Sequence, residues 1–182
     1  RTVHMIDTPG FDNPTQSDLE VLRQITQWLS ESQIQLNGVI YCHRIMSATS
    51  VSNLQVIRKM CGDSNLPALA LITTFWDLVD TDEGGERQKT LESTPHFWKE
   101  LIERGSQPFS CDDDRSTALE PVEYIIKRNQ AVRLQIQTEM GDPARLLEQT
   151  AAGKEIQGMD IAQLKRDMEL MRRQNEEERE RL

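Results

Sequence analysis

The chain has 182 residues and a net charge of −9, and this length suits one α/β domain of about 100–150 residues with an extension. The acidic balance excludes non-specific nucleic-acid binding, which needs clustered Lys and Arg. No apolar run has the length of a membrane span, and we expect no secretory signal. The three cysteines are widely spaced and form neither a metal motif nor a disulfide framework, so we expect a cytoplasmic protein.

The first predicted element is a short buried strand at Val3–Ile6, which runs directly into Asp7-Thr8-Pro9-Gly10. In P-loop GTPases an Asp and a Gly at this D-x-x-G spacing lie where the triphosphate ends. The carboxylate holds magnesium through water, and the Gly amide donates to the γ-phosphate without a side chain in the way. The alternative interpretation is a strand followed by an ordinary Pro-Gly turn.

Strand-like and helical segments then alternate along the chain to about residue 138. The predicted strands are Gly38–Cys42, Ala68–Thr73 and a weaker one near Pro108–Cys111. The predicted helices are Asp18–Leu29 with Ser17 or Asp18 as N-cap, Ser52–Cys61, Leu91–Arg104 ending near Gly105, and Ser116–Ile136. This alternation predicts an α/β fold, with a mostly parallel sheet and helices on both faces.

A second motif, Thr74-Phe75-Trp76-Asp77, closes the strand that ends at Thr73. In GTPases the corresponding strand ends in [NT]-K-x-D, and the Asp accepts hydrogen bonds from N1–H and the 2-amino group of guanine. Adenine has no such pair of donors, so the carboxylate discriminates between the two bases. Here Thr74 and Asp77 match the spacing, and Phe75 stands where the Lys would cover the base.

Two other polar features near the predicted strand ends have more than one interpretation. Arg44 ends a strand on the side where parallel sheets bind ligands, and it is either a phosphate or dimer contact or an ordinary surface residue. Asp112-Asp113-Asp114 could suggest a metal site, but three adjacent carboxylates cannot all face one ion. A solvated loop is the simpler explanation of this run.

The composition changes after residue 138, so we predict a domain over residues 1–138 and a linker with a helical extension over 139–182. Gly141-Asp142-Pro143 breaks the preceding helix. From Met159 onward the chain is highly charged. Four apolar residues follow a heptad-like 3-4-3 spacing: Ile161, Leu164, Met168 and Met171. The same spacing continues with two polar residues, Asn175 and Glu178, and then Leu182. The alternatives are a short coiled coil and a solvated single helix.

Together, the motifs at Asp7–Asp12, Gly38–Ile45 and Thr73–Asp77 resemble those of fungal P-loop GTPases, G-domain proteins related to the septins and the immune-associated GTPases. The resemblance covers roughly residues 2–125. It implies a partial three-layer G-domain fold that binds GTP with Mg²⁺. By position, Asp7 would be the magnesium residue and Gly10 the γ-phosphate contact, while Thr74 and Asp77 would form the base site. No residue near Ser110–Asp112 matches the ribose-side loop.

The motif G-x-x-x-x-G-K-[ST], which wraps the phosphates in this family, does not occur in the chain. Three explanations stay open: an N-terminal part was removed, the gene model is short, or the protein never held a triphosphate. Phe11 stands where many GTPases have a water-orienting Gln, so we expect intrinsic hydrolysis to be slow or to depend on a partner or on dimerisation across the nucleotide. The leading hypothesis is a GTP-binding switch or assembly module, and the alternative is a nucleotide-free scaffold that binds a protein partner or a second copy through its C-terminal helix.

Overall fold

The computed structural model describes residues 2–11, 14–32, 34–46, 51–112 and 114–180, apart from the side chains of 51, 52 and 174–180. Its centre is a three-stranded parallel sheet in the order β1-β2-β3. The strands are β1 (Val39–Arg44), β2 (Leu69–Thr74) and β3 (Gln107–Ser110), which confirms the three strands predicted after residue 37. The middle strand carries the most apolar run, and all but its last residue are buried.

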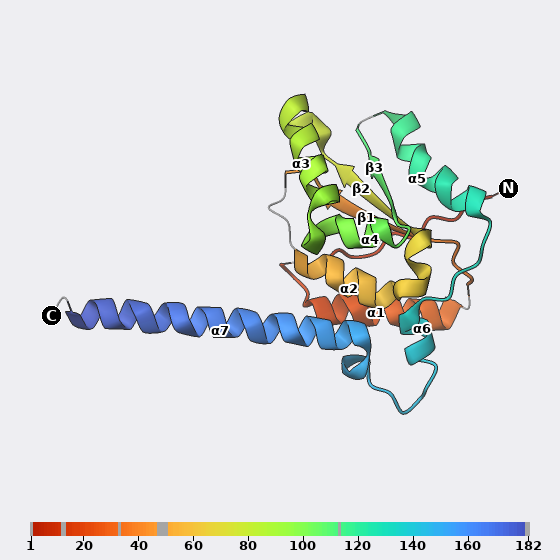
Figure 1. Cartoon of the computed structure of the whole chain (residues 1–182). Helices are drawn as coiled ribbons and strands as arrows, with labels where there is room; N and C mark the ends of the chain where they lie inside the picture. Colours follow the sequence, from red (N-terminus) through yellow and green to blue (C-terminus); the bar gives the residue numbers. More distant parts are fainter. Residues whose placement is uncertain (1, 12–13, 33, 47–50, 113, 181–182) are drawn as a thin grey trace.

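Helices surround this sheet, and the last of them extends far beyond the rest of the molecule (Figure 1). The α-helices are α1 (Asp18–Ser32), α2 (Val51–Cys61), α3 (Thr81–Ser93), α4 (Glu100–Glu103), α5 (Arg115–Arg128), α6 (Gln135–Glu139) and α7 (Ala151–Glu180). Short helical segments are η1 (Asp63–Ala68), η2 (Trp76–Leu78), η3 (Pro95–Lys99) and η4 (Leu147–Gln149). Among the described residues, none of these helices combines the length and the apolarity that crossing a membrane requires.

The two faces of the sheet pack against different helices. On one face, His43 of β1 meets the edge of the Trp98 ring in η3, with 6.0 Å between ring centroids. On the other face, Phe109 of β3 packs against Tyr124 of α5, with centroids 5.8 Å apart. Alternate residues of a strand point to opposite faces, so the sheet is covered on both sides. The predicted α/β arrangement with helices on both faces is therefore confirmed at this coarse level.

The predicted strand at Val3–Ile6 is wrong. Residues 2–10 form no strand, and the side chains of Val3, Met5 and Ile6 are 46%, 65% and 39% exposed. An apolar run becomes a strand only when a neighbouring strand satisfies its backbone groups, and no described residue does so here.

Two of the predicted helices are divided in the structure. The expected helix at Leu91–Arg104 is replaced by α3, a break before Pro95, and then η3 and α4. The break follows because Thr94 precedes a proline and takes an extended conformation. The expected helix at Ser116–Ile136 ends at Asn129, whose left-handed φ of 47° caps α5, and α6 begins separately.

The packed core continues past residue 138 into the first turns of α7. Leu147, Ala152 and Ile156 are buried in the same cluster as Leu22 and Leu71. The helix begins at Ala151, eight residues before the charged stretch at Met159. Gly153 permits this packing, because a Cβ there would lie 2.2 Å from the Leu147 carbonyl oxygen.

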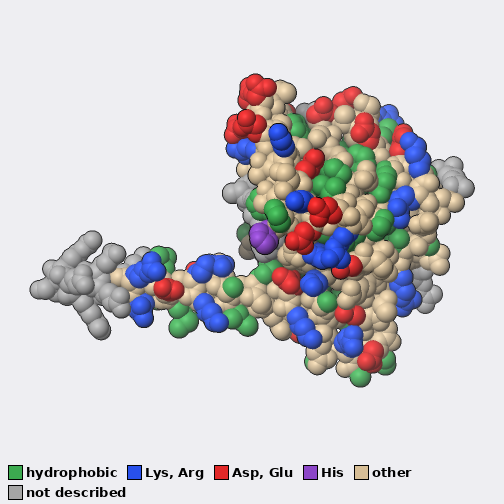
Figure 2. Space-filling model, in the orientation of Figure 1, with side chains coloured by type: hydrophobic (Ala, Val, Ile, Leu, Met, Phe, Trp, Pro, Cys, Tyr) green, Lys and Arg blue, Asp and Glu red, His purple; other side chains and the backbone are tan. Residues whose placement is uncertain are grey.

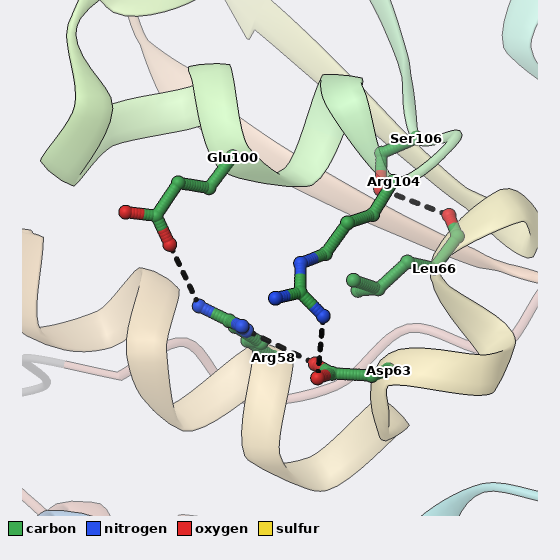
Figure 3. A network of polar contacts seen from close by, with 6 residues as sticks. All are labelled: Arg58, Asp63, Leu66, Glu100, Arg104 and Ser106. Carbon is green, nitrogen blue, oxygen red and sulfur yellow. Dashed lines mark hydrogen bonds and ion pairs between the residues drawn. The ribbon is translucent and has the colours of Figure 1, made fainter.

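A network of ion pairs joins the elements that precede β2 and β3 (Figure 3). The Arg58 guanidinium contacts Asp63 and Glu100, each at 3.1 Å, and Arg104 reaches the other oxygen of Asp63 at 2.7 Å. Nearby, the buried Ser106 hydroxyl donates to the Leu66 carbonyl at 2.8 Å. These contacts connect α2, η1 and α4 at the amino ends of the strands.

Candidate functional site

The carboxyl ends of the three strands meet at the opposite edge of the sheet. Arg44 of β1 is in register with Thr74 of β2, and Thr73 is in register with Ser110 of β3. In parallel α/β sheets this edge is where ligands bind, because loops and helix N-termini converge there. Of the predicted base-site residues, Thr74 is the last residue of β2 and Asp77 lies three residues further on, so both lie at this edge.

The turn after β2 has a constrained backbone. Phe75 adopts the left-handed conformation with φ 63° and ψ 41°, which is unusual for a bulky residue. The short helix η2 follows at once, closed by a hydrogen bond from the Leu78 amide to the Phe75 carbonyl at 3.3 Å. Thr74 stabilises the start of the turn, since its hydroxyl donates to the His43 carbonyl at 3.3 Å. The fold therefore fixes the path of the backbone from Thr74 to Leu78.

Trp76 anchors this turn to the rest of the body. Its indole Nε1 donates to the Thr73 hydroxyl at 3.0 Å, and that hydroxyl in turn donates to Gln88 Oε1 of α3 at 2.8 Å. The ring lies so close to Gly84 that a Cβ there would be 2.8 Å from ring atom Cζ3. Because Trp76 points inward, the next side chain, Asp77, is left exposed to solvent.

Cationic groups lie next to this turn. The Arg44 guanidinium stacks over the Phe75 ring, 4.7 Å from its centroid. Arg87 of α3 donates to the Ile45 carbonyl at 3.3 Å and pairs with Glu83 at 2.6 Å. The edge thus combines an exposed carboxylate, a half-exposed aromatic ring and a stacked guanidinium, which together suit a planar, polar ligand.

Asp7 and Gly10 lie on the exposed N-terminal segment. Burial raises the pKa of the Cys42 thiol on β1, and the negative charge of Asp7 raises it further. A Cβ at Gly10 would meet open space, and the following Phe11 packs against the core. Among the described residues, no hydrogen bond or ion pair links Asp7 or Gly10 to the Thr74–Asp77 turn.

The acidic residues after β3 have structural partners. Asp114 caps α5 by accepting from the Ser116 amide at 3.3 Å, and the hydrogen bonds from Ser116 lower the pKa of its carboxyl. Asp112 accepts from the Thr117 hydroxyl at 2.6 Å. Asp113 lies outside the described residues, as does Asp12 of the N-terminal motif. The described carboxylates here shape a loop and a helix cap.

The side chains place limits on a metal site. Within the described ranges, no group of three or more His, Cys, Asp and Glu residues could hold a metal ion. Mg²⁺ is commonly held by one or two carboxylates together with water and the phosphates of a nucleotide. Asp7 is a single exposed carboxylate. It could take part in a magnesium site only if a bound nucleotide supplied most of the other ligands.

His43 is a buried titratable group next to this edge. It is 7% exposed, its Nε2 has no hydrogen-bond partner, and burial lowers its pKa below the ordinary value of 6.5. Burial likewise raises the pKa of Cys61 to about 12 and raises that of Cys111. These groups stay neutral near pH 7, so they do not supply charge to the site.

The residues that hold the turn, Trp76, Gly84 and Gln88, were not predicted from the sequence. A Gly-Gly pair inside a segment of charged residues was the available signal, since a glycine within a helix often marks close packing.

A separate polar groove of about 450 Å³ lies at the start of α7 and shares no residue with the carboxyl edge. It is lined by Lys59, Glu139, Arg145, Gln149, Ala151, Lys154 and Glu155.

Comparison with known proteins finds no matching family model, no matching curated protein and no matching solved structure.

Proposed function

We propose that the chain is part of a guanine-nucleotide-binding protein, and that the turn after β2 is its base-recognition element. The observation that carries this proposal is the anchored turn at the carboxyl edge, in which Trp76 is fixed and Asp77 is exposed. An exposed carboxylate at such a point can accept from N1–H and the 2-amino group of guanine together. A charge-assisted pair of hydrogen bonds of this kind discriminates strongly against adenine.

The neighbouring groups extend the same proposal. Phe75 and the Arg44 guanidinium stacked on it offer a flat surface for a purine. Asp7 would hold Mg²⁺, with the Gly10 amide toward the γ-phosphate, and the metal would neutralise phosphate charge. Hydrolysis would be slow, because Phe11 packs against the core and cannot orient a water molecule. A cytoplasmic location is part of this proposal.

The alternative function is a nucleotide-free scaffold that binds a protein or a second copy through α7. One observation favours it: α7 has an exposed apolar side. Leu164 and Met168, for example, are 61% and 64% exposed. The body would then serve only to position the helix.

Nucleotide titration of the 182-residue chain, followed by backbone amide NMR, separates the two functions. Because the phosphate-loop motif is absent, we expect weak binding. Millimolar GTP with Mg²⁺ should shift the amides of Arg44 and Thr74–Leu78, and ATP should not. Asp77→Asn should abolish the GTP response and create one to xanthosine triphosphate, whose carbonyl replaces the 2-amino group. The unfolding free energy should change by less than about 0.5 kcal/mol, because Asp77 is exposed.

Asp82→Asn is the matched control, since Asp82 is an exposed carboxylate five residues further on. It should leave the GTP response unchanged. Equal responses to ATP and GTP, or a GTP response that survives Asp77→Asn, would refute base recognition by this turn. No response to any nucleotide would favour the scaffold.

A further inference from the structure

The part of α7 beyond Met159 exposes a continuous apolar seam. Ile161, Leu164, Met168 and Met171 are 56%, 61%, 64% and 61% exposed, and they follow one another at the alternating three- and four-residue spacing of a heptad. Figure 2 shows hydrophobic side chains together with Lys and Arg on this protruding helix. Four large, exposed apolar side chains in one row on the protruding part of the helix form an association surface.

The seam lies on the side of α7 that faces away from the body. The residues that pack against the body are Ala152, Ile156 and Met159, the first two fully buried and the third partly. With 3.6 residues per turn, Met159 and Ala152 project to the side opposite Ile161 and Leu164. The body therefore holds the root of the helix and does not cover the seam.

The charges beside the seam identify the occupant. If Ile161 and Met168 take heptad position a, then Asp160 and Asp167 take position g, and Lys165 and Arg172 take position e. In a parallel pair of helices each g residue faces the e residue of the following heptad on the other chain. Asp160 would then meet Lys165 of a second copy, and Asp167 would meet its Arg172. Both contacts are between opposite charges.

The opposite orientation would bring like charges together. In an antiparallel pair, position e faces e and position g faces g. The basic Lys165 and Arg172 would then face the same basic residues of the other copy, and the two aspartates would face each other. Residues at e and g set the partner and the orientation of a coiled coil, so a parallel pair is the arrangement that these charges select.

We propose that α7 pairs with the α7 of a second copy of this chain as a short, parallel, in-register coiled coil centred on Ile161–Met171. This pairing specifies the partner that the scaffold function left open, namely a second copy of the chain. It does not depend on nucleotide binding. The seam covers less than two heptads within the described side chains, because those of Asn175 and Glu178 and all of Leu182 lie outside them. Pairing is therefore concentration-dependent, and the anchored root helps by keeping the helix formed.

Sedimentation equilibrium of the full chain tests the pairing, with two matched leucines as probes. Leu164 lies in the seam and is 61% exposed, whereas Leu170 lies outside it and is 58% exposed. The wild-type chain should show a monomer–dimer equilibrium. Leu164→Glu should weaken dimerisation by about tenfold or more, because it places a charge in the seam. Leu170→Glu should leave the dissociation constant unchanged. A wild-type monomer at all concentrations, or equal effects of the two variants, would overturn the proposal.

Cysteine cross-linking tests the orientation. Ile161→Cys and Met171→Cys are oxidised separately and as a mixture, with the wild-type chain as the blank for its own cysteines, and the disulfides are mapped by mass spectrometry. A parallel in-register pair gives bonds between two copies of Cys at position 161 and between two at position 171. Bonds that join position 161 only to position 171 would overturn the parallel orientation, while self-association itself would stand.

Discussion

The amino and carboxyl ends of the strands are held in place by different kinds of contact. At the amino edge the buried Ser106 hydroxyl donates a hydrogen bond to the Leu66 carbonyl. Ion pairs of Asp63 with Arg58 and Arg104 connect the neighbouring helices. At the carboxyl edge the backbone is also fixed, but the side chains that emerge from it are exposed. Phe75 is 44% exposed and Leu78 57%. The amino edge is held by ion pairs between helices, whereas the turn at the carboxyl edge leaves the side chains of Phe75, Asp77 and Leu78 exposed to solvent.

The carboxyl edge depends on close packing, and the sharpest way to break it is at the Gly84–Trp76 contact. Gly84→Ala would place a methyl group 2.8 Å from the Trp76 ring and 3.2 Å from Val79. We expect the unfolding free energy to fall by about 1–3 kcal/mol, as for overpacking elsewhere. The amides of Thr74–Leu78 should shift, because Trp76 anchors that turn. Urea denaturation and amide NMR measure the two effects.

Gly85→Ala is the control for this contact, because a Cβ at Gly85 meets nothing within 4 Å. Replacing an exposed helical glycine by alanine should stabilise the chain by about 0.5–1 kcal/mol. If both variants destabilise to the same extent, the Trp76 contact does not hold the turn.

The amino edge depends on the Arg58 ion pairs. Arg58→Met keeps most of the side-chain volume and removes the bonds to Asp63 and Glu100. The Arg58 side chain is 16% exposed but its partners are about half exposed, so screening limits the loss of stability to about 1–2 kcal/mol. Lys127→Met, which removes the exposed pair with Glu123, should cost less than about 0.5 kcal/mol.

The effect of Arg58 should also depend on pH. The Arg58 hydrogen bond is the main cause that lowers the pKa of Asp63 below the ordinary value of 3.8. The stability that it contributes is present above that value and is lost as the pH falls below it. The wild-type and Arg58→Met chains should therefore converge in stability in acid. A constant difference from pH 7 down to pH 3 would mean that the pair contributes through packing alone.

We expect the smallest effect on the unfolding free energy from the protonation of His43, next to the carboxyl edge. Burial lowers its pKa in the folded chain, so the unfolded chain takes up a proton first as the pH falls below 6.5. Stability should decline on acidification from pH 7 toward pH 5.5, by about 1 kcal/mol and by no more than about 1.4 kcal/mol per pH unit. His43→Phe should remove this slope. His96→Phe, at an exposed histidine, should retain it, and an unchanged slope in both variants would exclude His43 as its source.

The sequence by itself determined the three strands of the sheet and the positions of α1 and α2. Its apolar runs are long enough to be buried on both faces, and its helical periodicity is clear at Leu22 and Leu29. It also predicted that Thr74 and Asp77 follow a strand end. Parallel strands carry such residues to a common edge whatever the surrounding detail.

Only the tertiary structure decided the remaining features. Val3–Ile6 has the composition of a strand, but none of the described residues pairs with it, and strand formation needs such a neighbour. The helix α3 is polar and contains Gly84 and Gly85, so its periodicity was weak, and its place follows from packing on Trp76. The helix α7 begins at Ala151, because Thr150 caps it by accepting from the Gly153 amide at 3.1 Å, and Gly153 fits against Leu147. The missing strand pairing and the two glycine contacts depend on which segments meet in the fold, and the composition of a single segment does not encode that.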